Sequence, residues 1–87
     1  MKYDVQFTNQ FKRDVKLAKK QGKDLEKLYA VIEILAEGRV LEAKYRDHSL
    51  SGNYNSCREC HIEPDWLLIY EIIDDVLVLM LRVTSII

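Results

Sequence analysis

The sequence predicts an α+β fold in which two helices pack on one face of a four-stranded, mostly antiparallel sheet. One observation behind this prediction is a change of period, because apolar side chains recur every three to four residues before about Arg39 and at every second residue after it. The other is the order of the elements, β-α-α-β-β-β. Helices covering one face of such a sheet, with the other face open, are the simplest arrangement that buries both apolar surfaces.

The N-terminal half is predicted to form one strand and two helices. Residues 2–7 alternate between polar and apolar side chains, as in a half-buried strand. Thr8 or Asn9 can cap the helix that follows, and Gly22 ends it. The second helix is predicted over residues 24–37, where the apolar side chains lie on one face.

The C-terminal half is predicted to form the rest of the sheet. A loop over residues 44–52 precedes three strands, at about 55–62, 66–73 and 76–83. Pro64-Asp65 and Asp74-Asp75 provide the turns between these strands, and the second turn is short enough for an antiparallel hairpin. The last strand is apolar on both faces, which is typical of a strand with neighbours on both sides.

Length and composition indicate a single globular domain spanning residues 1–87. With 48% hydrophobic and 31% charged residues, the chain is unlike a disordered protein. Its apolar runs are far shorter than the roughly 20 residues that a membrane helix needs, and residues 1–5 are unlike a signal peptide. We therefore expect a cytoplasmic protein without a membrane partner, in which both cysteines are reduced.

The net charge of −1 conceals an uneven distribution along the chain. Residues 1–48 carry 11 Lys and Arg against 8 Asp and Glu, whereas residues 49–87 carry 2 against 6. This balance is weaker than the basic excess of a dedicated nucleic-acid-binding domain. Contacts to phosphate would therefore come from the N-terminal half together with Arg58 and Arg82.

Both histidines of the chain are predicted to lie near one end of the C-terminal sheet. Taken singly, His48 in a loop and His61 on a strand have ordinary structural explanations. The predicted hairpin, however, places Asp65 and Trp66 beside His61, and the loop lets His48 reach the same end of the sheet. Because imidazole exchanges protons near neutral pH, this group indicates proton-transfer chemistry on a planar or phosphorylated substrate.

The segment Cys57-Arg-Glu-Cys60-His61 matches the pattern for covalent haem attachment. Residues 57 and 60 are an odd number of positions apart, so their side chains lie on opposite faces of the predicted strand. The same geometry argues against a zinc site formed by the two cysteines with His48 and His61. We therefore expect no metal and no cofactor, and we expect Cys60 to be a buried, inert thiol.

Two motifs carry a resemblance to a known family. They are Asp47-His48-x-Leu50-x-Gly52 and the segment from Arg58 to Tyr70, and the helical segment from Phe11 to Lys19 fits less specifically. In these residues the chain resembles YafQ-type toxins of the RelE superfamily, which belong to bacterial type II toxin–antitoxin systems. The resemblance covers nearly the whole chain and implies a RelE-like fold.

The resemblance also implies an activity and assigns residues to it. Such toxins enter the ribosomal A site and cut translated messenger RNA, and a cognate antitoxin, expected to be of the ribbon–helix–helix type, holds them inactive. Operator DNA would be contacted only through the antitoxin complex. The family's catalytic histidines and aspartate correspond here to His48, His61 and Asp65, with the adjoining tryptophan at Trp66.

The C-terminus departs from the family pattern. The family's tail supplies another catalytic histidine and a terminal aromatic residue. Here Ser85 aligns with that histidine, and the aromatic position lies beyond Ile87. A serine hydroxyl forms hydrogen bonds but cannot shuttle a proton at neutral pH. We therefore expect attenuated activity, unless the terminus was altered or the two remaining histidines suffice.

The resulting interpretation is the toxin of a toxin–antitoxin pair, a ribosome-dependent mRNA endonuclease. His48 and His61 would act as acid and base, in an order that the sequence leaves open, and Asp65 would orient one imidazole. The RNA-binding residues would be Arg46, Arg58 and Arg82 for phosphate and Trp66 for stacking a base or shaping the pocket. Two alternatives remain. One is a RelE-fold protein that only binds an antitoxin, an operator complex or another target, and the other is an inactive toxin remnant.

Overall fold

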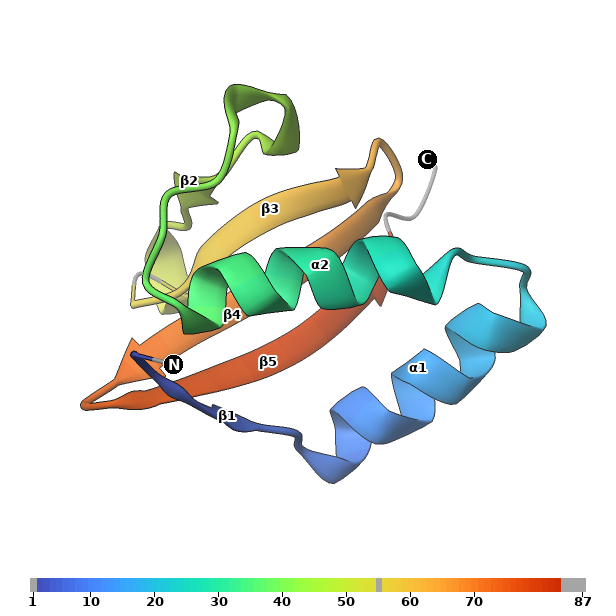
Figure 1. Cartoon of the computed structure of the whole chain (residues 1–87), viewed down its shortest axis with the longest axis horizontal. Coiled ribbons are helices and arrows are strands. Elements are labelled where there is room, and N and C mark those ends of the chain that lie inside the picture. Colours follow the sequence, from blue (N-terminus) through green and yellow to red (C-terminus); the bar gives the residue numbers. More distant parts are fainter. Residues whose placement is uncertain (1, 55, 84–87) are drawn as a thin grey trace.

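The computed structural model describes residues 2–54 and 56–83 and confirms the α+β class, with two helices and a mixed sheet (Figure 1). In chain order the elements are β1 (Asp4–Gln6), α1 (Asn9–Lys20), α2 (Leu25–Ala36), the 3-10 turn η1 (Ala43–Tyr45), β2 (His48–Ser49), the 3-10 turn η2 (Gly52–Tyr54), β3 (Arg58–Glu63), β4 (Trp66–Ile73) and β5 (Val76–Val83). The strand order is β1-β5-β4-β3-β2. β1 runs parallel to β5, and the other strand pairs are antiparallel.

α1 begins at the cap predicted from the sequence, Thr8, and α2 begins at a second capping residue, Asp24. The Oγ of Thr8 accepts a hydrogen bond of 3.0 Å from the backbone N–H of Phe11, and Oδ1 of Asp24 accepts one of 3.0 Å from the N–H of Glu26. Each bond satisfies a backbone donor that has no partner inside its helix. Gly22 follows α1 with a φ of 80°, a left-handed conformation that glycine adopts without strain. Within the described ranges, no helix is long and apolar enough to cross a membrane.

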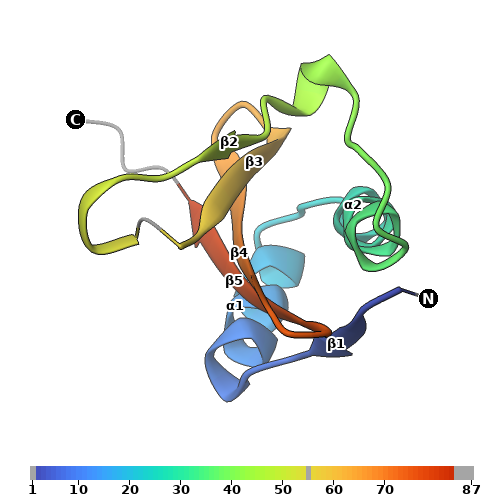
Figure 2. The same ribbon diagram turned by 90° about the vertical axis from the view of Figure 1, so that its left-hand side faces the viewer.

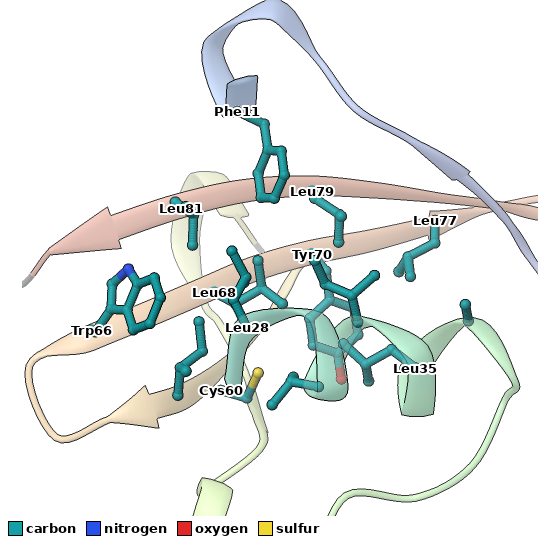
Figure 3. Packing of buried hydrophobic residues seen from close by; sticks show 14 of the residues in the cluster. Phe11, Leu28, Leu35, Cys60, Trp66, Leu68, Tyr70, Leu77, Leu79 and Leu81 are labelled. Carbon is teal, nitrogen blue, oxygen red and sulfur yellow. The ribbon is translucent and has the colours of Figure 1, made fainter. Parts of the chain in front are cut away.

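The helices pack on the same face of the sheet, and the hydrophobic core lies between the two layers (Figure 2). From the sheet, every second residue of β3, β4 and β5 points into this core, as the strand period requires (Figure 3). These sheet residues are Cys60, Ile62, Trp66, Leu68, Tyr70, Leu77, Leu79 and Leu81. From the helices they meet Phe11 and Ala18 of α1 and Leu28, Val31, Ile32, Leu35 and Ala36 of α2. The opposite face carries no helix of the described chain, as predicted.

The position of β5 also agrees with the prediction. It lies between β1 and β4, so it has a neighbour on each side. Hydrogen bonding to two strands satisfies its backbone groups and allows the strand to be apolar on both faces.

The number of strands differs from the predicted four. The segment 44–52, predicted as a loop, contains the two-residue strand β2, which pairs with Arg58 and Glu59 of β3. Two residues are too few to give an alternating pattern, and both side chains of β2 are exposed, so periodicity could not reveal this strand. β3 begins at Arg58 rather than near residue 55. Ser85 lies outside the described residues.

Candidate active site

A polar cluster lies on the open face of the sheet. Glu59 and His61 alternate with core residues of β3, so their side chains project away from the helices. In the strand register, Glu59 lies opposite Ile69 and His61 lies opposite Leu67. Leu67 and Ile69 are buried but do not belong to the helix-covered core. They form an apolar floor beneath the polar side chains.

β2 brings the second histidine to this cluster. Its pairing with β3 places His48 directly opposite Glu59, two residues before His61. The ring centroids of His48 and His61 are 6.2 Å apart, and the ring planes are inclined by 36°. Two imidazoles at this distance can contact opposite sides of one small bound group, such as a phosphodiester.

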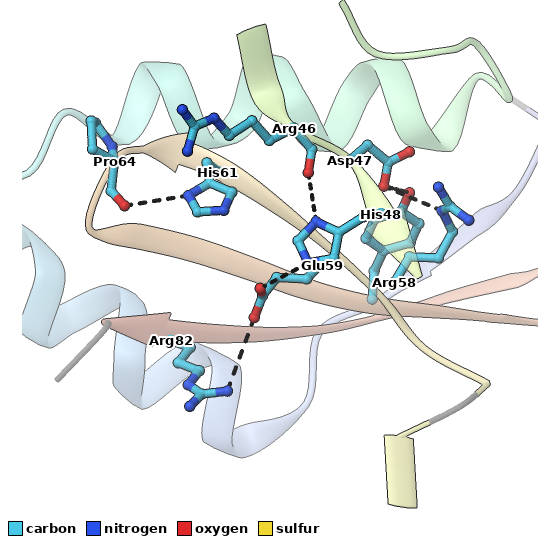
Figure 4. A network of polar contacts seen from close by, with 9 residues as sticks. Arg46, Asp47, His48, Arg58, Glu59, His61, Pro64 and Arg82 are labelled. Carbon is cyan, nitrogen blue, oxygen red and sulfur yellow. Dashed lines mark hydrogen bonds and ion pairs between the residues drawn. The ribbon is translucent and has the colours of Figure 1, made fainter. Parts of the chain in front are cut away.

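Both ring nitrogens of His48 have oxygen partners. Its Nδ1 lies 2.7 Å from the carbonyl oxygen of Arg46, and its Nε2 lies 3.3 Å from Oε1 of Glu59 (Figure 4). Because a carbonyl oxygen only accepts hydrogen bonds, Nδ1 carries a hydrogen and donates it there. Arg46 presents this carbonyl from a left-handed conformation with a φ of 51°, which is uncommon for a residue with a side chain. The protonated ring can therefore donate from both nitrogens.

His61 is held at one nitrogen. Its Nδ1 lies 3.3 Å from the carbonyl oxygen of Pro64 and donates to it, which fixes the tautomer of the neutral ring. Among the residues that the structure describes, Nε2 of His61 takes part in no hydrogen bond or ion pair. This nitrogen is free to accept a proton from a bound substrate.

A groove of about 500 Å³ opens beside His61. Three cationic side chains line it, Lys27 from α2 and Lys44 and Arg46 from η1 and its C-cap. Lys27 forms an ion pair with Glu63 at 3.3 Å. No carboxylate of residues 2–54 and 56–83 pairs with Lys44 or Arg46, so both are available to an anionic ligand.

Glu59 links the two sides of the polar cluster. Its side chain is only 11% exposed, and its oxygens lie 3.3 Å from Nε2 of His48 and 4.0 Å from Nη1 of Arg82. Glu59 is not among the site residues predicted from the sequence. The available signal was its place two residues before His61, on the same strand face.

Asp47 directly precedes His48, and its side chain forms its contacts on the helix-covered side of the sheet. Its Oδ1 accepts a hydrogen bond of 2.7 Å from the hydroxyl of Tyr70 and lies 3.3 Å from Nε of Arg58. Burial raises the pKa of Tyr70, and the bond to Asp47 raises it further, so the hydroxyl remains protonated and donates. The bond to Asp47 also raises the pKa of Arg58. Arg58, predicted to contact phosphate, is therefore engaged by Asp47.

Two other predicted residues lie away from the imidazoles. Asp65 is in the β3–β4 turn with a side chain 56% exposed, and its carboxylate lies 3.7 Å from Nζ of Lys23. Among the contacts of the described residues, none joins Asp65 to either histidine. Trp66 is completely buried, because it alternates with Leu68 and Tyr70 on the helix-covered face. A ring without exposed surface cannot stack on a base, which leaves shaping the pocket as the other role expected for Trp66.

The polar cluster has a donor set that fits a metal ion. His48, Glu59 and His61 offer ligand atoms that all lie within 4.8 Å of one another. Two imidazole nitrogens and one carboxylate oxygen suit Cu²⁺, Ni²⁺ or Zn²⁺. The expectation of no metal was based on the two cysteines with His48 and His61, and it did not consider Glu59 as a ligand beside the histidines.

The cysteines are free thiols, as expected, and Cys60 is fully buried. Burial raises the pKa of Cys60 to about 12. Because the thiolate is the reactive form, this side chain behaves as a small apolar core residue.

Comparison with known proteins agrees with this fold. Residues 3–85 match a family described as the bacterial toxin of type II toxin–antitoxin systems, YafQ. The mRNA interferase toxin YafQ of Escherichia coli (strain K12) is 41% identical over 75 residues, which cover 85% of this chain and 82% of that protein.

Solved structures are similar over nearly the whole chain. The crystal structure of YafQ from E. coli strain BL21(DE3) has a TM-score of 0.87 at 37% identity and covers 94% of this chain and 93% of its own. A copper-bound mutant toxin from Helicobacter pylori has a TM-score of 0.91 at 33% identity, with coverage of 95% and 96%. YafQ in the E. coli DinJ–YafQ toxin–antitoxin complex has a TM-score of 0.85 at 36% identity, with coverage of 95% and 93%. The chain therefore belongs to the YafQ family of toxins from bacterial type II toxin–antitoxin systems.

Proposed function

We propose that this chain is the toxin of a type II toxin–antitoxin pair and that it cuts messenger RNA on the ribosome as an endoribonuclease. The observation that carries the proposal is the pair of imidazoles 6.2 Å apart on the open face of the sheet. Glu59 and Arg82 lie beside this pair. The name of the E. coli relative, an mRNA interferase toxin, supports the same function.

The reaction is a transesterification within the RNA strand. The ribose 2′-hydroxyl attacks the adjacent phosphorus, so that a bond from 2′-oxygen to phosphorus forms and the bond from phosphorus to 5′-oxygen breaks. A base removes the proton of the 2′-hydroxyl, and an acid protonates the departing 5′-oxygen. Cationic groups stabilise the charge that develops on the phosphate. Two histidines and an arginine supply these functions without a cofactor.

The hydrogen-bond partners of the two histidines suggest which one acts as the base and which one as the acid. His61 donates from Nδ1 to a carbonyl and has Nε2 free, so we assign it the role of base. His48 faces an oxygen atom at each ring nitrogen, so its protonated form can donate from both, and we assign it the role of acid. In this assignment Glu59 orients the acid, the role that the sequence analysis gives to Asp65.

The cations and Asp65 have separate places in this proposal. Arg82 lies on the open face with a side chain 58% exposed, where it can bind the phosphate that is cut. Arg46 borders the groove beside His61, where it can bind the RNA backbone. Asp65 would act indirectly, by holding the turn whose Pro64 carbonyl orients His61.

The proposed partners follow from the family. An antitoxin would hold the toxin inactive, as the E. coli complex of DinJ with YafQ suggests for this chain. We propose that this antitoxin is of the ribbon–helix–helix type, that operator DNA is contacted only through the complex, and that the protein acts in the cytoplasm. The substrate would be messenger RNA in the ribosomal A site.

The test is cleavage in a cell-free translation extract, read by primer extension on this chain, His61→Ala and Ser85→His. We expect the His61→Ala rate to fall by about 10²–10⁴, the usual contribution of a positioned base. We expect Ser85→His to increase cleavage, because it adds a proton donor at the aligned family position. The same messenger RNA, incubated without initiating ribosomes, should stay intact.

Two outcomes would contradict the proposal. Equal cleavage by all three proteins would show that these residues are not the catalytic set. No cleavage by any of them, with folding verified by circular dichroism, would favour a protein that acts only by binding.

A second candidate activity is the binding of a transition metal ion by His48, Glu59 and His61. The spacing of their ligand atoms supports it, and so do the H. pylori relatives described as copper-bound and metal-bound toxins. An ion on these residues would occupy the nitrogens needed for proton transfer, so we expect it to inhibit cleavage. Calorimetric titration with Cu²⁺ tests this. Glu59→Gln should weaken binding, whereas Glu33→Gln, an exposed change on α2, should not.

A further inference from the structure

The anchoring of Asp47 has a consequence for the histidine that follows it. β2 contains only two residues and pairs with β3 through two residue pairs, His48 with Glu59 and Ser49 with Arg58. So short a strand holds its side chains weakly, because most of the backbone around it belongs to loops. The segment before His48 therefore requires another attachment if the imidazole is to keep one position.

Asp47 provides that attachment. One oxygen, Oδ1, receives the hydroxyl of Tyr70 at 2.7 Å and faces Nε of Arg58 at 3.3 Å. Tyr70 is 4% exposed and belongs to the hydrophobic core, so its hydroxyl is a rigid donor that requires a partner. Arg58 comes from β3, the strand that carries Glu59 and His61. The carboxylate is thus tied to both central strands of the site.

Because Asp47 and His48 are neighbours in an extended segment, the attachment of Asp47 also fixes the position of His48. Tyr70 lies on the helix-covered face, whereas Glu59, the partner of His48, lies on the open face. Neighbouring residues of an extended chain point to opposite sides, so holding Asp47 on one side fixes His48 on the other. Arg46, on the other side of Asp47, is held in its left-handed conformation and directs its carbonyl to Nδ1 of His48 (Figure 4).

We propose that Asp47 is a positioning residue for the reaction, held by Tyr70 and Arg58, and that it sets the place and tautomer of His48. This inference rests on the proposed nuclease function. Arg58 thereby acts on the reaction through Asp47 rather than by binding phosphate. A tyrosine hydroxyl in the hydrophobic core contributes to chemistry on the opposite face of the sheet.

The decisive variant is Tyr70→Phe, which removes one oxygen atom and keeps the ring in the core. We expect kcat for messenger RNA cleavage to fall about tenfold to a hundredfold with KM unchanged, because a small misplacement of a catalytic group has an effect of this size. The matched control is Tyr29→Phe, since Tyr29 is 47% exposed on α2. It should cleave at the original rate.

Three further variants separate positioning from general damage to the fold. Asp47→Asn keeps an oxygen that accepts from Tyr70 and should retain more activity than Asp47→Ala. The double variant Tyr70→Phe with Asp47→Ala should be no slower than Asp47→Ala alone, because Tyr70 acts through Asp47. Additive losses would overturn the inference.

Imidazole nitrogen NMR gives a readout that does not depend on cleavage. The chain has only two histidines, so the His48 signals are assigned by comparison with His61→Ala. In the original chain, we expect neutral His48 to carry its hydrogen on Nδ1. In Tyr70→Phe, we expect a mixture of the two tautomers. An unchanged His48 spectrum would overturn the inference. If the chain cleaves no RNA but the spectrum changes, the attachment is supported and the proposed nuclease function fails.

Discussion

The two faces of the sheet differ in what their side chains do, although the same strands build both. On the helix-covered face, Leu68, Leu77 and Leu79 are at most 1% exposed and pack against α1 and α2. On the open face, polar side chains surround a small apolar floor, and no helix of residues 2–54 and 56–83 covers them. The two-residue period of a strand therefore separates the residues that stabilise the fold from those that can carry out chemistry. In β3, Cys60 belongs to the helix-covered core, and the next residue, His61, belongs to the polar cluster on the open face.

This separation follows from what each group requires. Closely packed apolar side chains stabilise the fold because they are removed from water. Truncating one of them leaves a cavity and lowers the free energy of unfolding. Imidazole and guanidinium groups must reach a substrate and exchange protons, which they can do only where solvent and ligand have access. A change in the polar cluster of the open face should therefore alter activity, whereas truncation of an apolar side chain on the helix-covered face should alter the free energy of unfolding.

The largest expected effect is on the open face. His48→Ala should lower messenger RNA cleavage by about 10²–10⁴, because it removes the proposed acid. The free energy of unfolding should change by about 1 kcal/mol or less, because the His48 side chain is 47% exposed. Primer extension measures the first quantity and urea denaturation the second. Ser49→Ala, the neighbouring change in β2, should leave both nearly unchanged, and a large loss of stability in His48→Ala would contradict the separation of the faces.

The second largest effect is on the helix-covered face. Leu68→Ala should lower the free energy of unfolding by about 2–5 kcal/mol, since it leaves a cavity at a fully buried position. Met80→Ala is the matched change on the open face, where the side chain is 46% exposed, and should cost about 1 kcal/mol or less. Urea denaturation of both variants measures the difference. Similar losses would mean that the open face carries as much of the core as the covered one.

The sequence predicts the layers of this fold better than it predicts the site. Period and caps depend on local chemistry, so α1, α2, β4 and β5 could be located without the structure. β2 and the contact between His48 and Glu59 depend on pairing between distant segments, which periodicity does not record. The same limit explains why base stacking was predicted for Trp66 although its ring is buried. Its alternation with Leu68 indicates a core position, and the family resemblance does not say which face of β4 it occupies.

A third and chemically distinct test measures the reactivity of the Cys60 thiol, on β3, in the folded and in the denatured protein. Cys60 should resist iodoacetamide at pH 8 in the native protein, because burial raises its pKa to about 12 and leaves almost no thiolate. It should react at once in denaturant, where its pKa is ordinary. Mass spectrometry of a Cys57→Ser variant follows Cys60 alone. Rapid labelling of the folded variant would show that the helix-covered face opens to solvent.

The smallest expected effect concerns Asp65, which lies in the turn where the two faces meet. Its exposed carboxylate is 3.7 Å from Nζ of Lys23, a surface ion pair of the kind that contributes about 1 kcal/mol or less. Asp65→Asn should therefore change the free energy of unfolding by no more than that. We expect cleavage to fall by about tenfold or less, because the turn still presents the Pro64 carbonyl to His61. The comparison variant is Lys23→Gln, in the loop between α1 and α2, which removes the same ion pair together with the one to Glu63. If the two variants lose equal activity, Asp65 acts by holding the turn. If Asp65→Asn loses as much activity as His48→Ala while Lys23→Gln loses none, the carboxylate itself takes part in the chemistry, as the family resemblance implies.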